Sequence, residues 1–336
     1  MGERNGQLPG VLGRLPPAGR AFDVIGIGEN SVDILATVPR WPSPDEKLEL
    51  LNVVSLPGGQ AATALVGCAR LGCRTQYLGV FGNDEHGRSV ERALKAEGVD
   101  TRSCVTAHAP NRSAFILVDP AAGTRAVLWR RDPGLHWPDT SAFVGRVTRT
   151  RSLLVDTTDM AAAIAAATVA KKSGVPVIVD IDHSEPDADR LLKNVDVLVA
   201  SEGFPQAHTG AASLGVAMRQ LYSQYSAAVV VVTLGASGAL CWDGEAELHS
   251  PGFVLPVVDP TGAGDAFRAG FLAACLFGSS VLTDVLDFAN ATAALKCRAV
   301  GAQTGLPTRA EVLGLLTDRG VRRSNRAGST REAGHP

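Results

Sequence analysis

The sequence predicts an α/β protein with three layers, in which a doubly wound, mostly parallel sheet lies between two layers of helices and carries a small β-sheet lid. Short apolar runs rich in Val, Ile and Leu alternate with helical segments, an order that implies βαβ units. The runs lack polar alternation, which is typical of parallel strands covered on both faces. Two half-polar stretches, at residues 36–57 and 111–131, interrupt the alternation and predict the lid.

Six apolar runs are expected to form the strands of the main sheet, at residues 22–28, 75–80, 153–156, 175–180, 195–200 and 228–234. Helices are expected at residues 60–71, 86–97, 159–173, 187–193, 212–225, 263–277, 281–298 and 308–316. Ligands of such folds usually bind at the carboxyl ends of the strands. We therefore expect the lid to cover a cleft at that end of the sheet.

The composition is that of a soluble globular protein. Of the 336 residues, 45% are hydrophobic and 20% are charged, which excludes a wholly disordered chain. The formal net charge of −2 gives no electrostatic reason to bind nucleic acid or a membrane surface. We expect one folded domain at residues 21–317, between disordered tails at residues 1–20 and 318–336 that lack hydrophobic periodicity.

The cysteines and the apolar runs bear on the cellular compartment. The six cysteines form no CxxC pair and no zinc-site spacing, so reduced thiols in a cytoplasmic protein are expected. The N-terminal segment lacks a continuous apolar stretch, and no later run is long enough to span a bilayer. The sequence thus predicts neither export nor membrane insertion.

The most informative segment is DPTGAGDAFRAGF, at residues 259–271. Gly262 and Gly264 allow the backbone to approach a ligand closely, and the free N–H groups of a helix that begins near Ala263 favour an anion. Asp265 lies on the first turn of that helix. It is either a general base beside a phosphoryl-binding turn or a carboxylate that only complements the helix dipole.

This segment resembles the C-terminal signature of the ribokinase-like, or PfkB, family of carbohydrate and nucleoside kinases. Three further motifs agree in order and spacing: GIGENSVD at residues 26–33, PGGQAATA with ARLG at residues 57–72, and VTLGASG at residues 232–238. The resemblance extends from about residue 22 to residue 316. It implies a ribokinase-like fold, transfer of the γ-phosphoryl of ATP to a sugar hydroxyl, a requirement for Mg²⁺, and a homodimer formed through the lid.

The resemblance also assigns roles to single residues. Asp265 becomes the base, with the backbone of Gly262, Ala263 and Gly264 as the anion hole. The predicted acceptor-binding residues are Asp33, Gly58, Gly59 and Thr63, and the predicted nucleotide-binding residues are Thr233, Gly235, Gly238 and Asn290. Without the resemblance, Asp33 would more often be a turn or cap residue, the glycines ordinary turn residues, and Asn290 a packing residue.

Two departures from the family pattern concern the acceptor and the metal. Thr63 stands where the double-glycine motif usually has Asn. The NxxE motif is replaced by SEGF at residues 201–204, which leaves Glu202 as the nearby carboxylate. Glu202 and Asp259 are the predicted metal residues, with Mg²⁺ held largely through water and nucleotide phosphates. Asp259 and the AVGA segment at residues 299–302 resemble loops that hold a monovalent cation such as K⁺.

The lid segment WRRDP, at residues 129–133, contains adjacent arginines whose guanidinium groups suit an oxyanion on the acceptor. Arg131 is the predicted acceptor residue, but neighbours in a strand point to opposite faces, so a solvated edge is an equal interpretation. Arg112 is similarly ambiguous.

Two rival functions stay open: a nucleoside kinase on the same fold, and a regulator that binds sugar or nucleotide without turnover. A dehydrogenase is disfavoured because GIGENS lacks the third glycine of a dinucleotide fingerprint, and no P-loop motif is present. The sequence does not identify the sugar.

Overall fold

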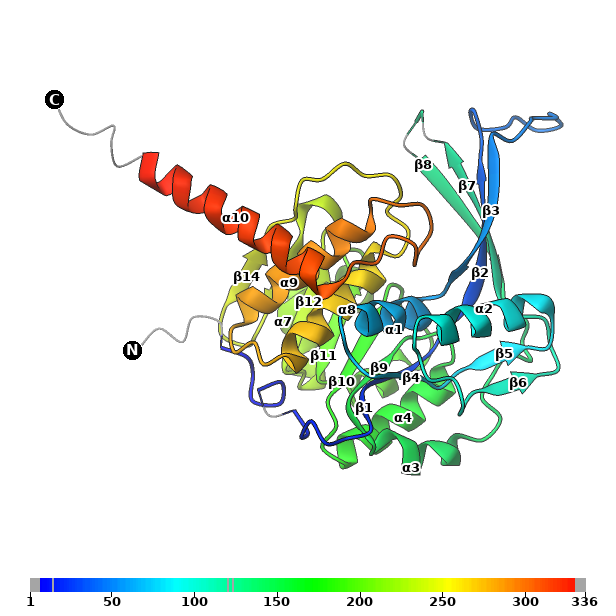
Figure 1. The fold of residues 1–336 in the computed structure, drawn as a ribbon. Coiled ribbons are helices and arrows are strands. Elements are labelled where there is room, and N and C mark those ends of the chain that lie inside the picture. Colours follow the sequence, from blue (N-terminus) through cyan, green and yellow to red (C-terminus); the bar gives the residue numbers. More distant parts are fainter. Residues whose placement is uncertain (1–6, 14, 120, 123, 330–336) are drawn as a thin grey trace.

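The computed structural model describes residues 7–13, 15–119, 121–122 and 124–329. In these residues the main sheet has eight strands in the order β14-β13-β12-β11-β10-β9-β1-β4 (Figure 1). Neighbouring strands are parallel from β12 to β4, whereas β13 and β14 pair antiparallel at the other edge. The strands are β1 (Phe22–Ile27), β4 (Thr75–Tyr77), β9 (Thr150–Val155), β10 (Val177–Ile181), β11 (Val197–Ser201), β12 (Val229–Thr233), β13 (Ala239–Trp242) and β14 (Glu247–Ser250).

The two faces of this sheet are buried under separate helical layers. Alternate strand residues explain this: Val24 and Leu154 belong to one apolar cluster, and Ile25 and Leu153 to the other. The first layer comprises α1 (Gln60–Arg70), α2 (Glu85–Ala96), α8 (Ala263–Leu276), α9 (Leu282–Lys296) and α10 (Arg309–Ser329). The second comprises α3 (Val144–Val147), α4 (Met160–Lys172), α5 (Ala188–Leu192), α6 (Phe204–Thr209) and α7 (Leu214–Tyr225), with a short 3₁₀ turn at Thr140–Phe143. The predicted three-layer fold is confirmed.

The lid is a separate sheet with strand order β3-β2-β7-β8, which projects from the sandwich (Figure 1). Its strands are β2 (Ser31–Thr37), β3 (Asn52–Gly58), β7 (Ser113–Asp119) and β8 (Thr124–Arg130). The lid therefore begins at Ser31 rather than at residue 36. Asp33, which precedes the predicted lid segment, lies inside lid strand β2, because β1 ends at Ile27 and the chain turns at Gly28.

Several elements differ from the sequence-based expectation. The run at residues 75–80 contains only β4, and the chain then forms β5 (Val80–Gly82), which pairs with β6 (Val105–Ala107) in a two-stranded sheet. The antiparallel β13 and β14 and the short α3 and α6 were not expected. They are short and carry weak periodicity, so local sequence gives little signal for them.

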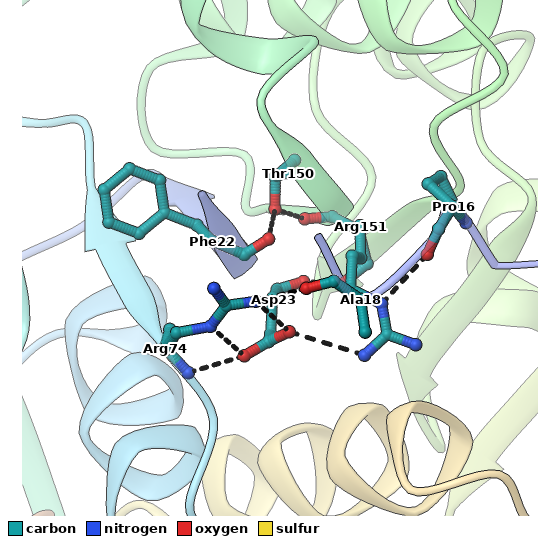
Figure 2. Close-up of polar contacts among 8 residues, drawn as sticks. Pro16, Ala18, Phe22, Asp23, Arg74, Thr150 and Arg151 are labelled. Atoms are coloured by element: carbon teal, nitrogen blue, oxygen red, sulfur yellow. Dashed lines mark hydrogen bonds and ion pairs between the residues drawn. The ribbon is translucent and has the colours of Figure 1, made fainter. Parts of the chain in front are cut away.

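The N-terminal segment contacts the fold, although residues 1–20 were predicted to be a disordered tail. Leu12 is buried among the residues of the first helical layer, and the Leu8 N–H donates to the Ser280 carbonyl at 2.9 Å. Figure 2 shows Arg74 and Arg151 donating to the carbonyls of Ala18 and Pro16, each at 2.9 Å. Scattered apolar residues and free carbonyls were sufficient for docking without any periodic pattern. Residues 1–6 and 14 lie outside the described residues.

The C-terminal helix also exceeds its predicted end. Helix α10 continues to Ser329, through part of the tail predicted to be disordered at residues 318–336. Helix propagation costs much less than nucleation, so the segment packed against α9 extends into a sequence that would not start a helix. Residues 330–336 lie outside the described residues. Within the described part of the chain, no helix is both long and apolar enough to cross a membrane.

Candidate active site

A cleft of about 900 Å³ lies between the lid and the carboxyl ends of the main strands. Both sides contribute polar residues to it. Asp33, Arg125 and Trp129 come from the lid, and Gly262 and Asp265 come from the start of α8. This is the position predicted from the fold, because strands of one direction end at the same edge of the sheet.

Residues 259–264, here called the anion turn, lead into helix α8. Gly262 precedes the helix in a left-handed conformation with φ of 79°, and a Cβ atom there would lie 2.7 Å from the Ala302 carbonyl oxygen. Only glycine fits that position. The Ala263 N–H donates to the Pro260 carbonyl at 3.1 Å, whereas no backbone acceptor among the described residues takes the N–H of Gly262 or Gly264. Of the three predicted anion-hole N–H groups, that of Ala263 is thus engaged within the turn, and the role of all three stays a prediction.

Asp265 lies on the first turn of α8, partly exposed to the cleft. Burial of the surrounding site raises the pKa of its carboxyl well above the usual range, and the Arg268 guanidinium acts against that rise. The carboxylates of Asp182, Glu29 and Asp156 act together with burial. A base with a raised pKa binds a proton more strongly than an ordinary aspartate. The helix-dipole interpretation alone predicts the opposite direction.

Arg268 lies one turn after Asp265 and is almost fully buried. Its guanidinium forms an ion pair with Asp180 at the end of β10, and both side chains are 3% exposed. It also lies 3.6 Å from the Asp182 carboxylate and packs against Gly264, where a Cβ atom would be 2.5 Å from Arg268 Nη1. A positive charge is thus held directly beneath the anion turn.

Asp182 lies between the Arg268 guanidinium and the start of helix α1. Its carboxylate accepts a hydrogen bond from Gln60 Nε2 at 2.7 Å and one from the Ser201 hydroxyl. Gln60 is the first residue of α1, next to the predicted acceptor residues. Asp182 therefore ties together the ends of β10 and β11 and the start of α1.

The predicted acceptor residues Asp33, Gly58 and Gly59 lie together. The Asp33 carboxylate accepts a hydrogen bond from the Ser31 hydroxyl at 2.7 Å and lines the cleft. A Cβ atom at Gly58 would lie 2.1 Å from Asp33 Oδ2, so glycine leaves the space that this carboxylate occupies. Gly59 has φ of 97° and precedes α1, where the backbone turns beside Glu29 and Asn30.

Thr63, also predicted to bind the acceptor, lies outside the cleft. It is fully buried, its hydroxyl accepts a hydrogen bond from Gln303 Nε2 at 3.3 Å, and it does not line the cleft. The structure therefore places Thr63 apart from Asp33 and Gly59, which line the cleft, and its contact with the acceptor stays a prediction. Helix α1 is buried on all sides at residues 61–68, so burial at Thr63 reflects the position of the whole helix in the core.

The lid arginines divide between the cleft and solvent as strand geometry requires. Arg131 lines the cleft, whereas Arg130 does not.

Arg112 also lines the cleft, pairs with the buried Glu29, and lies 5.2 Å from the centre of the Trp129 ring. Burial raises the pKa of the Glu29 carboxyl to about 7, although Arg112 acts to lower it. Arg125 donates to the Thr261 hydroxyl at 3.1 Å, which joins the lid to the anion turn.

The predicted nucleotide residues lie outside the cleft that the acceptor residues line. Thr233 ends β12, and the turn Gly235–Ser237 follows, with φ of 56° at Gly235 and 94° at Gly238. Asn290 is buried, and its amide donates to the Ser250 carbonyl at 2.9 Å and the Ser250 hydroxyl at 2.8 Å. These bonds hold its amide nitrogen at the start of the loop that leads to the anion turn, and the predicted nucleotide role of Asn290 stays a prediction.

The two predicted metal residues, Glu202 and Asp259, have different surroundings. Glu202 is exposed, and Asp259 is buried with its carboxylate oxygens bonded to the N–H groups of Thr261 at 2.9 Å and Gly301 at 2.7 Å. Among the described residues, no group of three or more His, Cys, Asp or Glu side chains is arranged to hold a metal ion. Mg²⁺ held largely through water and nucleotide phosphates needs no such group, so the magnesium requirement stays a prediction.

Sequence reasoning missed Arg268, Asp182, Arg125 and the buried Asp156. Asp156 accepts the Glu29 N–H at 2.7 Å and so fixes the turn after β1. A partial signal existed, because Asp156 and Asp180 end predicted strands, where ligand-binding residues concentrate. No local signal distinguished Arg268 or Arg125 from surface arginines.

Comparison with known proteins agrees with this geometry. The model of the pfkB family carbohydrate kinases matches residues 22–309. The ribokinase of Haemophilus influenzae is 28% identical over 86% of this chain and 97% of its own length, and the nucleoside kinase of Methanothermobacter thermautotrophicus is 25% identical over 88% and 96%. The structure of Arabidopsis thaliana ribokinase complexed with ribose and ATP aligns with a TM-score of 0.77 at 27% identity, covering 88% of this chain and 99% of that one. The chain belongs to the pfkB family of carbohydrate kinases and is a phosphotransferase with an alcohol group as acceptor.

Proposed function

We propose that this kinase transfers the γ-phosphoryl of ATP to a hydroxyl of a small sugar, with Asp265 as the general base. One observation carries the proposal: Asp265, the anion turn and Asp33 line a single cleft beneath the lid. The proposed base, Asp265, and the anion turn thus lie in the same cleft as Asp33, whose carboxylate is suited to binding sugar hydroxyls. A protein that only binds sugar has no use for the base.

The proposed reaction begins when Asp265 accepts the proton of the attacking hydroxyl. The raised pKa of the Asp265 carboxyl favours this step, because burial destabilises its charged form. The N–H groups of Gly262 and Gly264 then stabilise the negative charge on the transferring phosphoryl. Arg268 supplies a fixed positive charge below the turn, which offsets the several carboxylates gathered there.

The proposed acceptor lies between Asp33 and the lid. Asp33 accepts hydrogen bonds from neighbouring sugar hydroxyls, and Arg112 and Arg131 contact the far end of the acceptor. The contact of Arg125 with Thr261 links closure of the lid to the anion turn. Closure excludes water and so limits ATP hydrolysis.

We also propose that two lids pair in a homodimer. Val53, Phe115 and Leu128 are each about half exposed, and their strand register places them on the lid face opposite the cleft. Apolar side chains grouped on a free sheet face favour association with a similar surface. Sedimentation of wild type and of Phe115→Lys tests this; a wild type that stays monomeric at all concentrations contradicts it.

The test of the proposed function is ADP release from Mg-ATP with ribose, ketohexoses, 2-keto-3-deoxy acids and nucleosides. We expect one sugar class to give turnover that Asp265→Asn abolishes, whereas Asp23→Asn, altered at the opposite end of the sheet, retains it. Turnover only with nucleosides would favour the nucleoside kinase. Binding of ATP and a sugar without any turnover would favour the non-catalytic regulator.

A further inference from the structure

A buried lysine lies behind the anion turn. Lys296, the last residue of α9, has no exposed surface, and its Nζ donates to the Asp259 carbonyl oxygen at 2.8 Å. A buried ammonium is costly unless a neighbouring charge or acceptor compensates it. Asp259 supplies both, because its carbonyl accepts the hydrogen bond and its buried carboxylate carries the opposite charge.

Asp259 joins the two loops that meet at this place. Its carboxylate oxygens accept the N–H of Thr261 in the anion turn and the N–H of Gly301 in the loop after α9. The Asp259 N–H donates in turn to the Cys297 carbonyl at 3.1 Å. The lysine charge is therefore held where the anion turn contacts the loop that follows α9.

The family resemblance places a monovalent cation at this junction, bound by Asp259 and residues 299–302. The residues present do not fit it. The Asp259 carbonyl oxygen already accepts a hydrogen bond from the Lys296 ammonium. A K⁺ ion beside this buried ammonium would be repelled, because the site is poorly solvated. An ammonium group and K⁺ both bind carbonyl oxygens and carry one positive charge, so one can replace the other.

We propose that the Lys296 ammonium takes the place of the monovalent cation, so that this kinase orders its anion turn without K⁺. The charge is attached to α9 and cannot dissociate. Lys296 acts through the Asp259 junction and is a positioning residue, since it does not line the cleft. The inference depends on the proposed function in one respect, because its test uses ADP as the probe of the anion turn.

The test compares the ADP dissociation constant, measured by calorimetry, and the melting temperature in KCl and in choline chloride at equal ionic strength. For wild type we expect neither quantity to depend on the cation, with the dissociation constant changing less than about twofold. For Lys296→Met we expect ADP to bind at least about tenfold more weakly in choline chloride and K⁺ to restore most of that loss. Lys172→Met, at an exposed lysine, is the control and should match wild type.

Two results would overturn the proposal: K⁺ strengthening ADP binding or raising the melting temperature of the wild type specifically, or Lys296→Met behaving like the control. If Lys296→Met does not fold, the wild-type comparison still decides, and Lys296→Arg should stay independent of K⁺. If ADP binds to no variant in either salt, the proposed nucleotide site fails. The melting temperatures without nucleotide would then still test the role of Lys296.

Discussion

Asp23 and the pair Asp265 and Asp180, at opposite ends of the main sheet, have carboxyl pKa values shifted in opposite directions. At the amino end, Asp23 accepts hydrogen bonds from Arg74 and Arg151 (Figure 2). Burial opposes its ionisation, but these bonds outweigh burial and hold the pKa of the Asp23 carboxyl below its usual range. At the carboxyl end, burial outweighs the single arginine and raises the pKa of Asp265 and Asp180 well above the usual range.

The difference separates a structural cluster from the proposed catalytic one. Asp23 is saturated by donors and fastens the N-terminal segment to the sheet. At the other end, neither carboxylate oxygen of Asp180 has a hydrogen-bond partner among the described residues beyond its ion pair with Arg268. Carboxylates that are gathered without enough donors cost stability, and such sites persist where the chemistry needs them.

The largest expected effect is on turnover. Asp265→Asn removes the proposed base and should lower kcat by about 10³-fold, within the range that general base catalysis supplies. Steady-state ADP release with the identified sugar measures it. A loss of less than about tenfold would contradict the assigned role. Asp23→Asn, an identical change at the amino end, should leave kcat unchanged.

Breaking the buried ion pair should have the next largest effect, on stability. Arg268→Met leaves Asp180 buried without a counter-charge and should lower the free energy of unfolding by about 3–5 kcal/mol. Urea denaturation measures the loss. The double variant Arg268→Met with Asp180→Leu should recover most of it, because an apolar pair needs no compensation. A single variant as stable as wild type would show that the pair is solvated.

The variants Glu29→Gln and Asp23→Asn should change the pH dependence of the free energy of unfolding in opposite directions. The folded pKa of Glu29 is about 7, above its unfolded value, so wild type loses stability as pH rises from about 4.5 to about 7. Relative to wild type, Glu29→Gln should gain up to about 3 kcal/mol across this window. The folded pKa of Asp23 is lowered, so its contribution is present above its unfolded value and disappears as pH falls through the folded pKa. Urea denaturation of Glu29→Gln, Asp23→Asn and wild type at several pH values measures how each free energy of unfolding varies with pH. If both variants differ from wild type in the same direction, the two carboxyl groups are not shifted oppositely.

The smallest effect is expected from the exposed partner at the amino end. The Arg74 side chain is 52% exposed, so its ion pair with Asp23 is screened by solvent. Arg74→Ala should lower the free energy of unfolding by about 1 kcal/mol or less, and less still at high salt. Urea denaturation at two salt concentrations tests this. A loss as large as that of Arg268→Met would contradict the difference between the two ends.

The sequence predicted the main strands and the long helices because their signals are local. Apolar runs and helical periodicity located β1, β9 to β12 and the helices α1, α2, α4, α8 and α9 within a few residues. The anion turn was also predicted from the sequence, because its glycines and the helix that follows are contiguous in the chain. The start of the lid was missed, because the turn at Gly28 has no distinctive local pattern.

The partners of the functional side chains could not be read from the sequence. Thr63 faces Gln303, and Asn290 bonds to Ser250, each across a long separation in sequence. Arg268 and Lys296 look like ordinary helix residues until the fold buries them against Asp180 and Asp259.

The sequence by itself determined the family, the layered α/β fold and the phosphotransferase signature, because apolar periodicity and a continuous glycine turn depend only on neighbouring residues. Tertiary structure alone decided which carboxylates meet at the cleft and which cations compensate them. The physical reason is that charge is costly to bury, so its pairing depends on the distances and solvent exposure that the folded chain creates.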